Sequence, residues 1–220
     1  MTHTDAPALE MGPIGQMMKD GCWDLHQSAE NGTVAKGLIS GELSKADYTA
    51  LVSQMYLFNK RLDEAVRAHR DGQPSLKALI DDEQLQTPYY EADLKDLGVD
   101  AGSLEAAPGT AEAIALVDRV ENENPADLLA LHYVREGANN GNRFVARKLM
   151  QVWGQSDLAG MKHLDPYGDA QRAKWETFKT VLNEQPFSDD EKRSLVATGR
   201  EMFKAVIAIH NDVESGAAKA

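Results

Sequence analysis

The stretch PIGQMMKDGCWDLHQSAEN, from Pro13 to Asn31, sets the fold class of this chain. Proline suits the first turn of a helix, and Gly32 follows as an end signal. The apolar residues between them recur at intervals of three and four, which is the period of one helix face. That face carries Met17, Met18, Cys22, Leu25 and Ala29. The pattern therefore predicts an amphipathic helix over residues 13–31.

The same period continues through the rest of the chain. Apolar spacing and start signals predict further helices that begin at Ser44, after Ser75, at Thr87, at Thr110, at Asn124, before Trp175 and at Ser188. The sequence predicts a loop at residues 154–168. The sequence shows no sustained alternation of apolar and polar residues, the pattern typical of a strand. We therefore predict an all-α fold.

Composition limits the domain organisation and the partners. A chain of 220 residues with 42% hydrophobic content favours one domain, which we place at residues 12–214 between flexible tails at 1–11 and 215–220. The net charge of -12 argues against nucleic acid or an anionic membrane surface as a partner. We also expect no membrane span and no signal peptide, and the single Cys22 fits a reducing compartment, so we expect a cytoplasmic protein.

A line of polar side chains follows one face of the first predicted helix. Lys19, His26 and Glu30 are separated by intervals that place them on one side. One interpretation is that His26 binds a metal through one ring nitrogen, while Glu30 accepts a hydrogen bond from the other and Lys19 meets a negative group of the ligand. The other interpretation is a partly buried histidine that is paired with its own carboxylate neighbour. The spacing alone leaves both open.

Residues 137–142, GANNGN, are unusual in the middle of a predicted helix. Each glycine costs about 1 kcal/mol relative to alanine in a helix interior. The segment is either a kink or a break between two helices, or it is a bare stretch of backbone that lets a flat ligand approach closely. A planar macrocycle with a central metal, held between His26 and this segment, would account for both features.

Four segments resemble the haem oxygenase family in the family's own order. They are DLHQSAEN at 24–31, GELSKADY at 41–48, DLKDL at 93–97 and LLALHYVR at 128–135. The resemblance implies a single-domain helical bundle in which haem lies between a proximal helix and a kinked distal helix. It also implies that His26 is the proximal ligand to the haem iron.

In this family haem b is both cofactor and substrate. The resemblance therefore implies oxidative cleavage of haem to biliverdin, carbon monoxide and ferrous iron, with O2 and with electrons from a ferredoxin or flavoprotein reductase. It implies a monomer that carries Lys19, Tyr133 and Lys179 near the haem propionates. The family more often has arginine where Lys179 stands, and lysine offers a point charge without the two-pronged grip.

The chain departs from the family at the distal helix. The family usually reads Gly-Asp-x-Ser-Gly-Gly there, and its aspartate orders the water network at the bound oxygen. Aligned without gaps from Tyr133, the family's glycine falls on Ala138 and its aspartate on Asn139; a shift of two residues instead puts Ala138 at the aspartate. Neither alignment restores a carboxylate, although an amide can still bind water. We predict that Ala138 lies against the haem and that the distal catalytic residues are Gly137, Asn139, Asn140 and Gly141.

Two alternatives to the enzyme stay open at this point. The missing aspartate allows a haem carrier or sensor that does not cleave its ligand. His210 and Glu214 repeat the spacing of His26 and Glu30, so a two-metal carboxylate oxidase is a second alternative on a helical bundle. The remaining histidines, among them His132, are expected to be structural.

Overall fold

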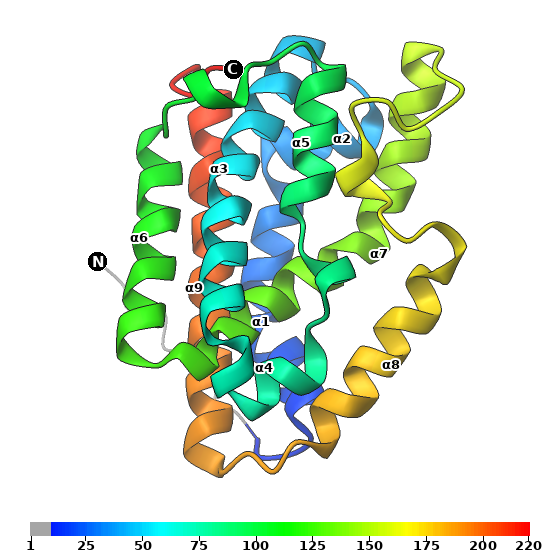
Figure 1. The fold of residues 1–220 in the computed structure, drawn as a ribbon. Helices are drawn as coiled ribbons and strands as arrows, with labels where there is room; N and C mark the ends of the chain where they lie inside the picture. The colour runs from blue at the N-terminus through cyan, green and yellow to red at the C-terminus, as the bar shows by residue number, and fades with distance from the viewer. Residues whose placement is uncertain (1–9) are drawn as a thin grey trace.

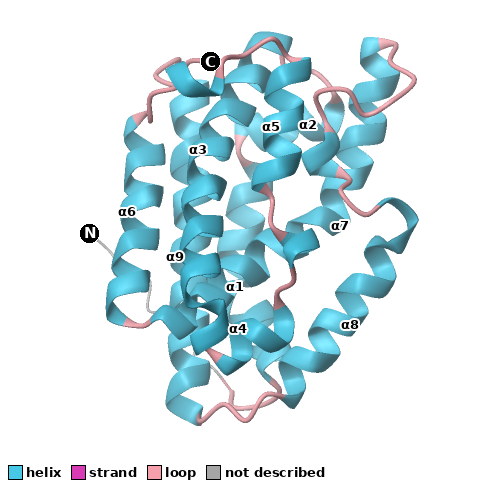
Figure 2. Ribbon diagram, in the orientation of Figure 1, coloured by secondary structure: helices cyan, strands magenta, loops and turns pink. Residues whose placement is uncertain are grey.

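A computed structural model of the protein describes residues 10–220, and every extended regular element in that range is an α-helix (Figure 2). Short 3-10 turns join several of them. The helices are α1 (Ile14–Asn31), α2 (Thr33–Ser40), α3 (Lys45–His69), α4 (Pro74–Leu79), α5 (Thr87–Asp96), α6 (Pro108–Glu123), α7 (Leu128–Trp153), α8 (Gln171–Glu184) and α9 (Asp189–Glu214). The prediction of an all-α, single-domain bundle is confirmed.

The last helix, α9, is the central element of the bundle (Figure 1). It packs against α1, α6, α7 and α3, and the main apolar core forms between these helices. A second apolar cluster joins the C-terminal half of α7 to α3 and α5. The first cluster includes α7 as far as Val134 and the second takes it up again at Val145 and Ala146. The middle of α7 therefore lies between two apolar cores and belongs to neither.

The signals at the helix ends are mostly formed as predicted. Ser188 and Glu191 make both bonds of a capping box at the start of α9. Ser44 caps α3, because its side chain accepts a hydrogen bond from the Asp47 amide. In a complete capping box the Asp47 carboxylate would accept from the Ser44 amide, but here it accepts from the Ser44 hydroxyl. The Ser44 box is thus half formed, which still satisfies one free amide of the first turn.

The sequence patterns missed α2. This helix has eight residues and buries only Val34 deeply, so its apolar stripe is too short to stand out. Gly37 lies within it and Gly41 ends it in the left-handed conformation, with φ of 76°. The glycines that obscure the helical pattern are the residues that let α2 end sharply and turn toward α3.

The helix α7 is continuous through residues 137–142, so no loop divides it. The Asn124-Pro125 start signal first forms a 3-10 turn, and the α-helix begins at Leu128. Figure 1 shows that the two halves of α7 run in different directions. The interpretation as two separate helices is therefore wrong, and the segment belongs to a bent helix.

The two ends of the chain differ in what the structure describes. Residues 1–9 of the predicted N-terminal tail lie outside the described residues. In the predicted C-terminal tail, Ala218 is buried, and Gln54 donates a hydrogen bond to the Lys219 carbonyl at 3.1 Å. This part of the tail is docked on α3, because a buried amide needs the acceptor that Lys219 provides. Among the described residues, no helix is long and apolar enough to cross a membrane.

Candidate functional site

His26 lies on a partly exposed face of α1, and aromatic neighbours hold its ring. Trp23 stacks on the imidazole with the ring centroids 5.2 Å apart, and Phe203 of α9 meets it edge-on at 5.7 Å. The side chain is 40% exposed, yet its Nδ1 atom is buried without a hydrogen-bond partner. The exposed area of the side chain therefore belongs to its other atoms, and Nε2 makes no hydrogen bond to a described residue.

Glu30 lies one turn beyond His26, as the spacing predicts. Its Oε2 atom is 3.5 Å from His26 Nδ1, close enough for charge attraction but without hydrogen-bond geometry. Glu30 is thus the acceptor within reach of a protonated Nδ1, and Nε2 is the ring nitrogen without a carboxylate neighbour.

Two contacts relate α7, the predicted distal helix, to α1, although the two helices make few direct contacts with each other. At one end Tyr133 of α7 donates a hydrogen bond to the Gly15 carbonyl of α1 at 3.4 Å. At the other end α2, which continues α1, packs against the C-terminal half of α7. His26 lies about 16 Å along α1 from Gly15, and Gly141 lies about 12 Å along α7 from Tyr133. The register therefore puts His26 close to the level of the bare segment.

Two residues in the segment of α7 at this level are exposed. Ala138 and Gly141 are both exposed, and a Cβ atom added to Gly141 would meet no other atom within 4 Å. Phe144, one turn further on, is 66% exposed. Gly137 differs, because a Cβ atom there would lie 3.3 Å from the Trp175 ring of α8. Gly137 therefore has a packing reason to be glycine, whereas Gly141 has none in the protein alone.

The three predicted propionate ligands gather around one end of α1. Tyr133 contacts Gly15, and Lys19 follows Gly15 by one turn on α1. Asn183 of α8 accepts a hydrogen bond from the Gly15 amide at 2.9 Å, and Lys179 precedes Asn183 by one turn. Two cations and a phenol from three helices thus surround the end of α1 at which the two helices meet.

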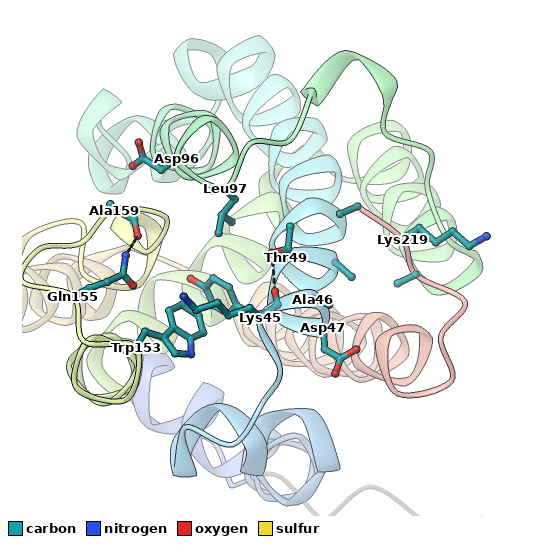
Figure 3. A pocket seen from close by; sticks show the side chains of 14 residues that line it. Lys45, Ala46, Asp47, Thr49, Asp96, Leu97, Trp153, Gln155, Ala159 and Lys219 are labelled. Carbon is teal, nitrogen blue, oxygen red and sulfur yellow. Dashed lines mark hydrogen bonds between the residues drawn. The ribbon is translucent and has the colours of Figure 1, made fainter.

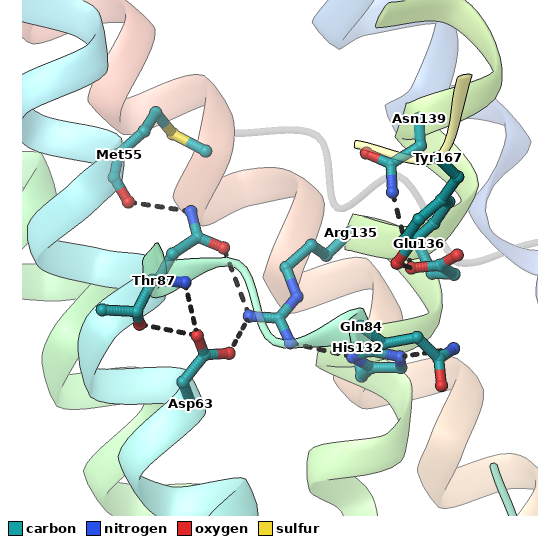
Figure 4. A network of polar contacts seen from close by, with 10 residues as sticks. Met55, Asp63, Gln84, Thr87, His132, Arg135, Glu136, Asn139 and Tyr167 are labelled. Carbon is teal, nitrogen blue, oxygen red and sulfur yellow. Dashed lines mark hydrogen bonds and ion pairs between the residues drawn. The ribbon is translucent and has the colours of Figure 1, made fainter. Parts of the chain in front are cut away.

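A buried polar network lies behind the bare segment (Figure 4). Arg135 donates to the Asp63 carboxylate of α3 at 2.6 Å and contacts His132 Nδ1 at 2.9 Å. Asp63 also accepts from the amide and the hydroxyl of Thr87, at 2.7 and 2.6 Å. Burial and the Arg135 charge lower the pKa of His132 well below its usual value, so that ring is neutral and structural as predicted.

Asn139 and Asn140 belong to different parts of this network. Asn139 is buried and donates to the Glu136 carboxylate at 3.4 Å, while the Asn140 amide donates to the Gly137 carbonyl at 3.0 Å. Glu136 also accepts from the Tyr167 hydroxyl at 3.0 Å. Glu136 and Asp63 were not predicted from the sequence patterns. The signal was present for Asp63, which falls among the buried positions of α3 although it carries a charge.

Two pockets of the structure lie away from the predicted residues. One, of about 680 Å³, opens at the start of α3 beside Lys45, Trp153 and the C-terminal residues (Figure 3). Another, of about 340 Å³, lies between α4 and α8. Neither is lined by His26 or by residues 137–141.

The two-metal alternative finds no support at His210 and Glu214. Glu214 accepts a hydrogen bond from the Thr33 hydroxyl at 2.8 Å, and burial lowers the pKa of His210 to about 4. Among residues 10–220, no group of three histidine, cysteine or acidic side chains is arranged to hold a metal ion. A single imidazole suits haem, because the porphyrin itself would supply four nitrogen ligands to the iron and the chain would need to add one.

Comparison with known proteins shows the family to which the chain belongs. The profile of the Heme oxygenase family matches residues 13–212. The heme oxygenase of Porphyra purpurea is 22% identical over 211 residues, covering 94% of this chain and 89% of that protein, and that of Guillardia theta is 23% identical over 203 residues, covering 90% and 84%. The crystal structure of heme oxygenase-1 from Synechocystis sp. PCC6803 in complex with heme superposes with a TM-score of 0.85 at 20% identity, covering 94% of each chain. The match over nearly the whole chain, in sequence and in fold, shows that this protein belongs to the haem oxygenase family.

Proposed function

We propose that this protein is a haem oxygenase that binds haem b through His26 and cleaves it to biliverdin, carbon monoxide and ferrous iron. The proposal rests on the partly exposed imidazole of His26 on α1 and on the exposed residues Ala138 and Gly141 of α7, where Gly141 leaves open space. When bound, haem supplies the iron centre that uses O2 and electrons.

On the proximal side, the chain fixes the ligand. Trp23 and Phe203 restrict the rotation of the His26 ring, and Glu30 attracts the proton of Nδ1. A proton held on Nδ1 leaves Nε2 unprotonated, which is the form that binds iron.

At the end of α1, cations meet the carboxylates of the ligand. Lys19 and Lys179 provide point charges in a protein of net charge -12, so these two side chains are expected to orient the propionates. In the apoprotein Lys179 pairs with Glu176 at 3.0 Å and lies over the Trp175 ring. When haem binds, a propionate would replace the Glu176 carboxylate as the partner of Lys179.

On the distal side, exposed Ala138 and Gly141 let the backbone approach the porphyrin face, and amides replace the carboxylate at this level. The Asn139 and Asn140 amides both donate and accept hydrogen bonds, so they can order water beside the ligand. The chain carries no flavin or nicotinamide motif, so we propose that a ferredoxin or a flavoprotein reductase supplies the electrons to a monomeric, cytoplasmic enzyme.

One titration tests the proposal. Hemin is added to the purified protein, the Soret band is recorded, and a reductant is then supplied under air. We expect a stoichiometric Soret band that disappears as biliverdin forms. A band that persists under these conditions supports the second candidate, a carrier or sensor, which the amide at Asn139 favours. Failure to bind hemin refutes both.

The ligand itself is tested by His26→Ala. We expect this variant to lose the Soret spectrum of a histidine-bound haem, while imidazole added to the solution restores it. His69→Ala is the matched control, because His69 is also partly exposed but bonds Glu121 on the far side of α3. An unchanged spectrum for His26→Ala would refute the assignment.

A further inference from the structure

A carboxylic acid is buried in the middle of α7, one turn before the distal amides. Glu136 is 0% exposed. Its Oε2 atom accepts hydrogen bonds from the Tyr167 hydroxyl at 3.0 Å and from Asn139 Nδ2 at 3.4 Å. Its Oε1 atom is buried and has no partner among the described residues. Because an unpaired buried oxygen is costly, this atom is a site for a proton or a water molecule.

The surroundings of Glu136 come from four parts of the chain. Arg135 of α7 points away toward Asp63, as Figure 4 shows, and Tyr167 closes the site from the loop before α8. Groups at longer range also act on the Glu136 charge: Lys174 of α8, Tyr89 of α5 and Asp81 before it. Burial raises the pKa of Glu136 to about 7, although the Tyr167 hydrogen bond and the Arg135 and Lys174 charges oppose the shift. Glu136 can therefore take up and release a proton at neutral pH.

The bond to Glu136 also sets the direction of the Asn139 amide. A carboxylate oxygen accepts hydrogen bonds, so the amide must turn its nitrogen toward Glu136. Figure 4 shows the Asn139 oxygen pointing away from Glu136. Asn139 thus presents an acceptor on the side away from the carboxylate.

We propose that Glu136 is a positioning residue for haem cleavage, which orients the Asn139 amide and supplies the proton that an amide cannot. The proposal rests on the proposed function. In the step, the O–H bond of the Glu136 carboxyl breaks and the proton passes to a water molecule at its unpaired Oε1 atom, which in turn gives up a proton to the water held by Asn139. The carboxylate then regains a proton from solvent. No group of the protein is oxidised or reduced.

The apoprotein gives the first test, in the variant Glu136→Gln. The folded pKa of Glu136, about 7, lies above its ordinary value of 4.5. Its contribution to stability is therefore complete below pH 4.5 and is lost as the pH rises from there through 7. We expect the melting temperature of the wild type to fall over this window, and the fall to be smaller in Glu136→Gln. Glu83→Gln is the matched control, because Glu83 is an exposed carboxyl bonded to Lys174 in the same region.

A second variant covers the case in which Glu136→Gln does not fold. Tyr167→Phe removes the hydroxyl that lowers the pKa of Glu136. We expect the same titration in the melting temperature to move to higher pH. If neither variant alters the pH dependence that the wild type shows, Glu136 does not titrate as proposed.

The haem-bound protein gives the decisive test. We expect Glu136→Gln to bind hemin with wild-type stoichiometry, but to lose the Soret band under reductant and air roughly 100-fold more slowly, as when a general acid is removed. The rate should also lose its dependence on a group near pH 7, and Glu136→Asp should restore part of it. A purely structural role would lower hemin binding and leave the pH profile in place. If the wild type binds no hemin, the proposed function fails as well; if Glu136→Gln cleaves haem at the wild-type rate, this proposal alone fails.

Discussion

Replacing Arg135 by methionine tests the buried network behind the bare segment. The Arg135 side chain is 6% exposed and that of Asp63 is 0% exposed, and the two form an ion pair at 2.6 Å. Arg135→Met keeps an apolar chain in place of the guanidinium and removes the charge. The Asp63 carboxylate is then left buried without a cation, with Thr87 as its donor.

The expected loss of stability is large for a single substitution. Removing one partner of a buried ion pair costs about 3 to 5 kcal/mol. The two hydrogen bonds from Thr87 still satisfy Asp63 in part, so we expect the lower end, about 3 kcal/mol. With a urea slope of about 2 kcal/mol/M, the unfolding midpoint should fall by about 1.5 M. A total stability of about 5 to 15 kcal/mol leaves the variant folded but much weakened.

Urea unfolding of the apoprotein, followed by circular dichroism, measures this change. The double variant, Asp63→Leu with Arg135→Met, removes both charges, and we expect it to recover at least half of the loss because no isolated charge remains buried. His69→Ala serves as a control for removal of a partly exposed polar side chain on α3. A loss below about 1 kcal/mol for Arg135→Met, or a double variant that loses the sum of the two single losses, would refute the assignment of the stability to this ion pair.

Three further substitutions test the packing of the helices. Gly141→Ala should stabilise the apoprotein by up to about 1 kcal/mol, because it improves a helix at an open position, yet weaken hemin binding; a hemin titration beside a thermal melt checks both. Gly109→Ala should destabilise by about 1 to 3 kcal/mol, because its Cβ would lie 2.6 Å from the Ala208 backbone of α9, and an unchanged melt would contradict that close packing. Ser188→Ala should cost about 1 kcal/mol through loss of the cap on α9, and Ser188→Asp, which can still cap, should restore most of it in the same urea assay.

The elements that could be predicted from the sequence are those with local signals. The helix at 13–31 carries its apolar stripe and both end signals within one stretch, and α9 begins with a complete capping box. The α2 helix could not be predicted, because eight residues with internal glycine give too few apolar positions to define a period. Its stability comes from packing against α7 and α9, which the local sequence does not record.

The candidate site likewise contains residues whose positions the local sequence predicts and residues whose contacts it does not. His26 and Glu30 lie on one helix, so their relative position follows from the spacing. Tyr133 can be predicted because the residues around it resemble the family pattern. The pairing of Glu136 with Tyr167 joins residues 31 positions apart, through a loop whose path no local pattern specifies. From the sequence alone, a charged residue in a helix is expected to be exposed to solvent, and only the structure shows that it is buried.

Of the two glycines in the middle of α7, the structure leaves Gly141, and not Gly137, as evidence for a flat ligand. Both Gly137 and Gly141 weaken α7, and the sequence treats them alike. The Trp175 ring leaves too little room for a side chain at Gly137, so packing within the protein accounts for that residue. Nothing within 4 Å accounts for Gly141, which lies in an exposed stretch of α7 at the level of His26. A cost of about 1 kcal/mol that no contact of the folded protein offsets is best explained by a molecule that the protein binds there. We therefore predict that the stability of the apoprotein and the binding of haem make opposite demands at Gly141.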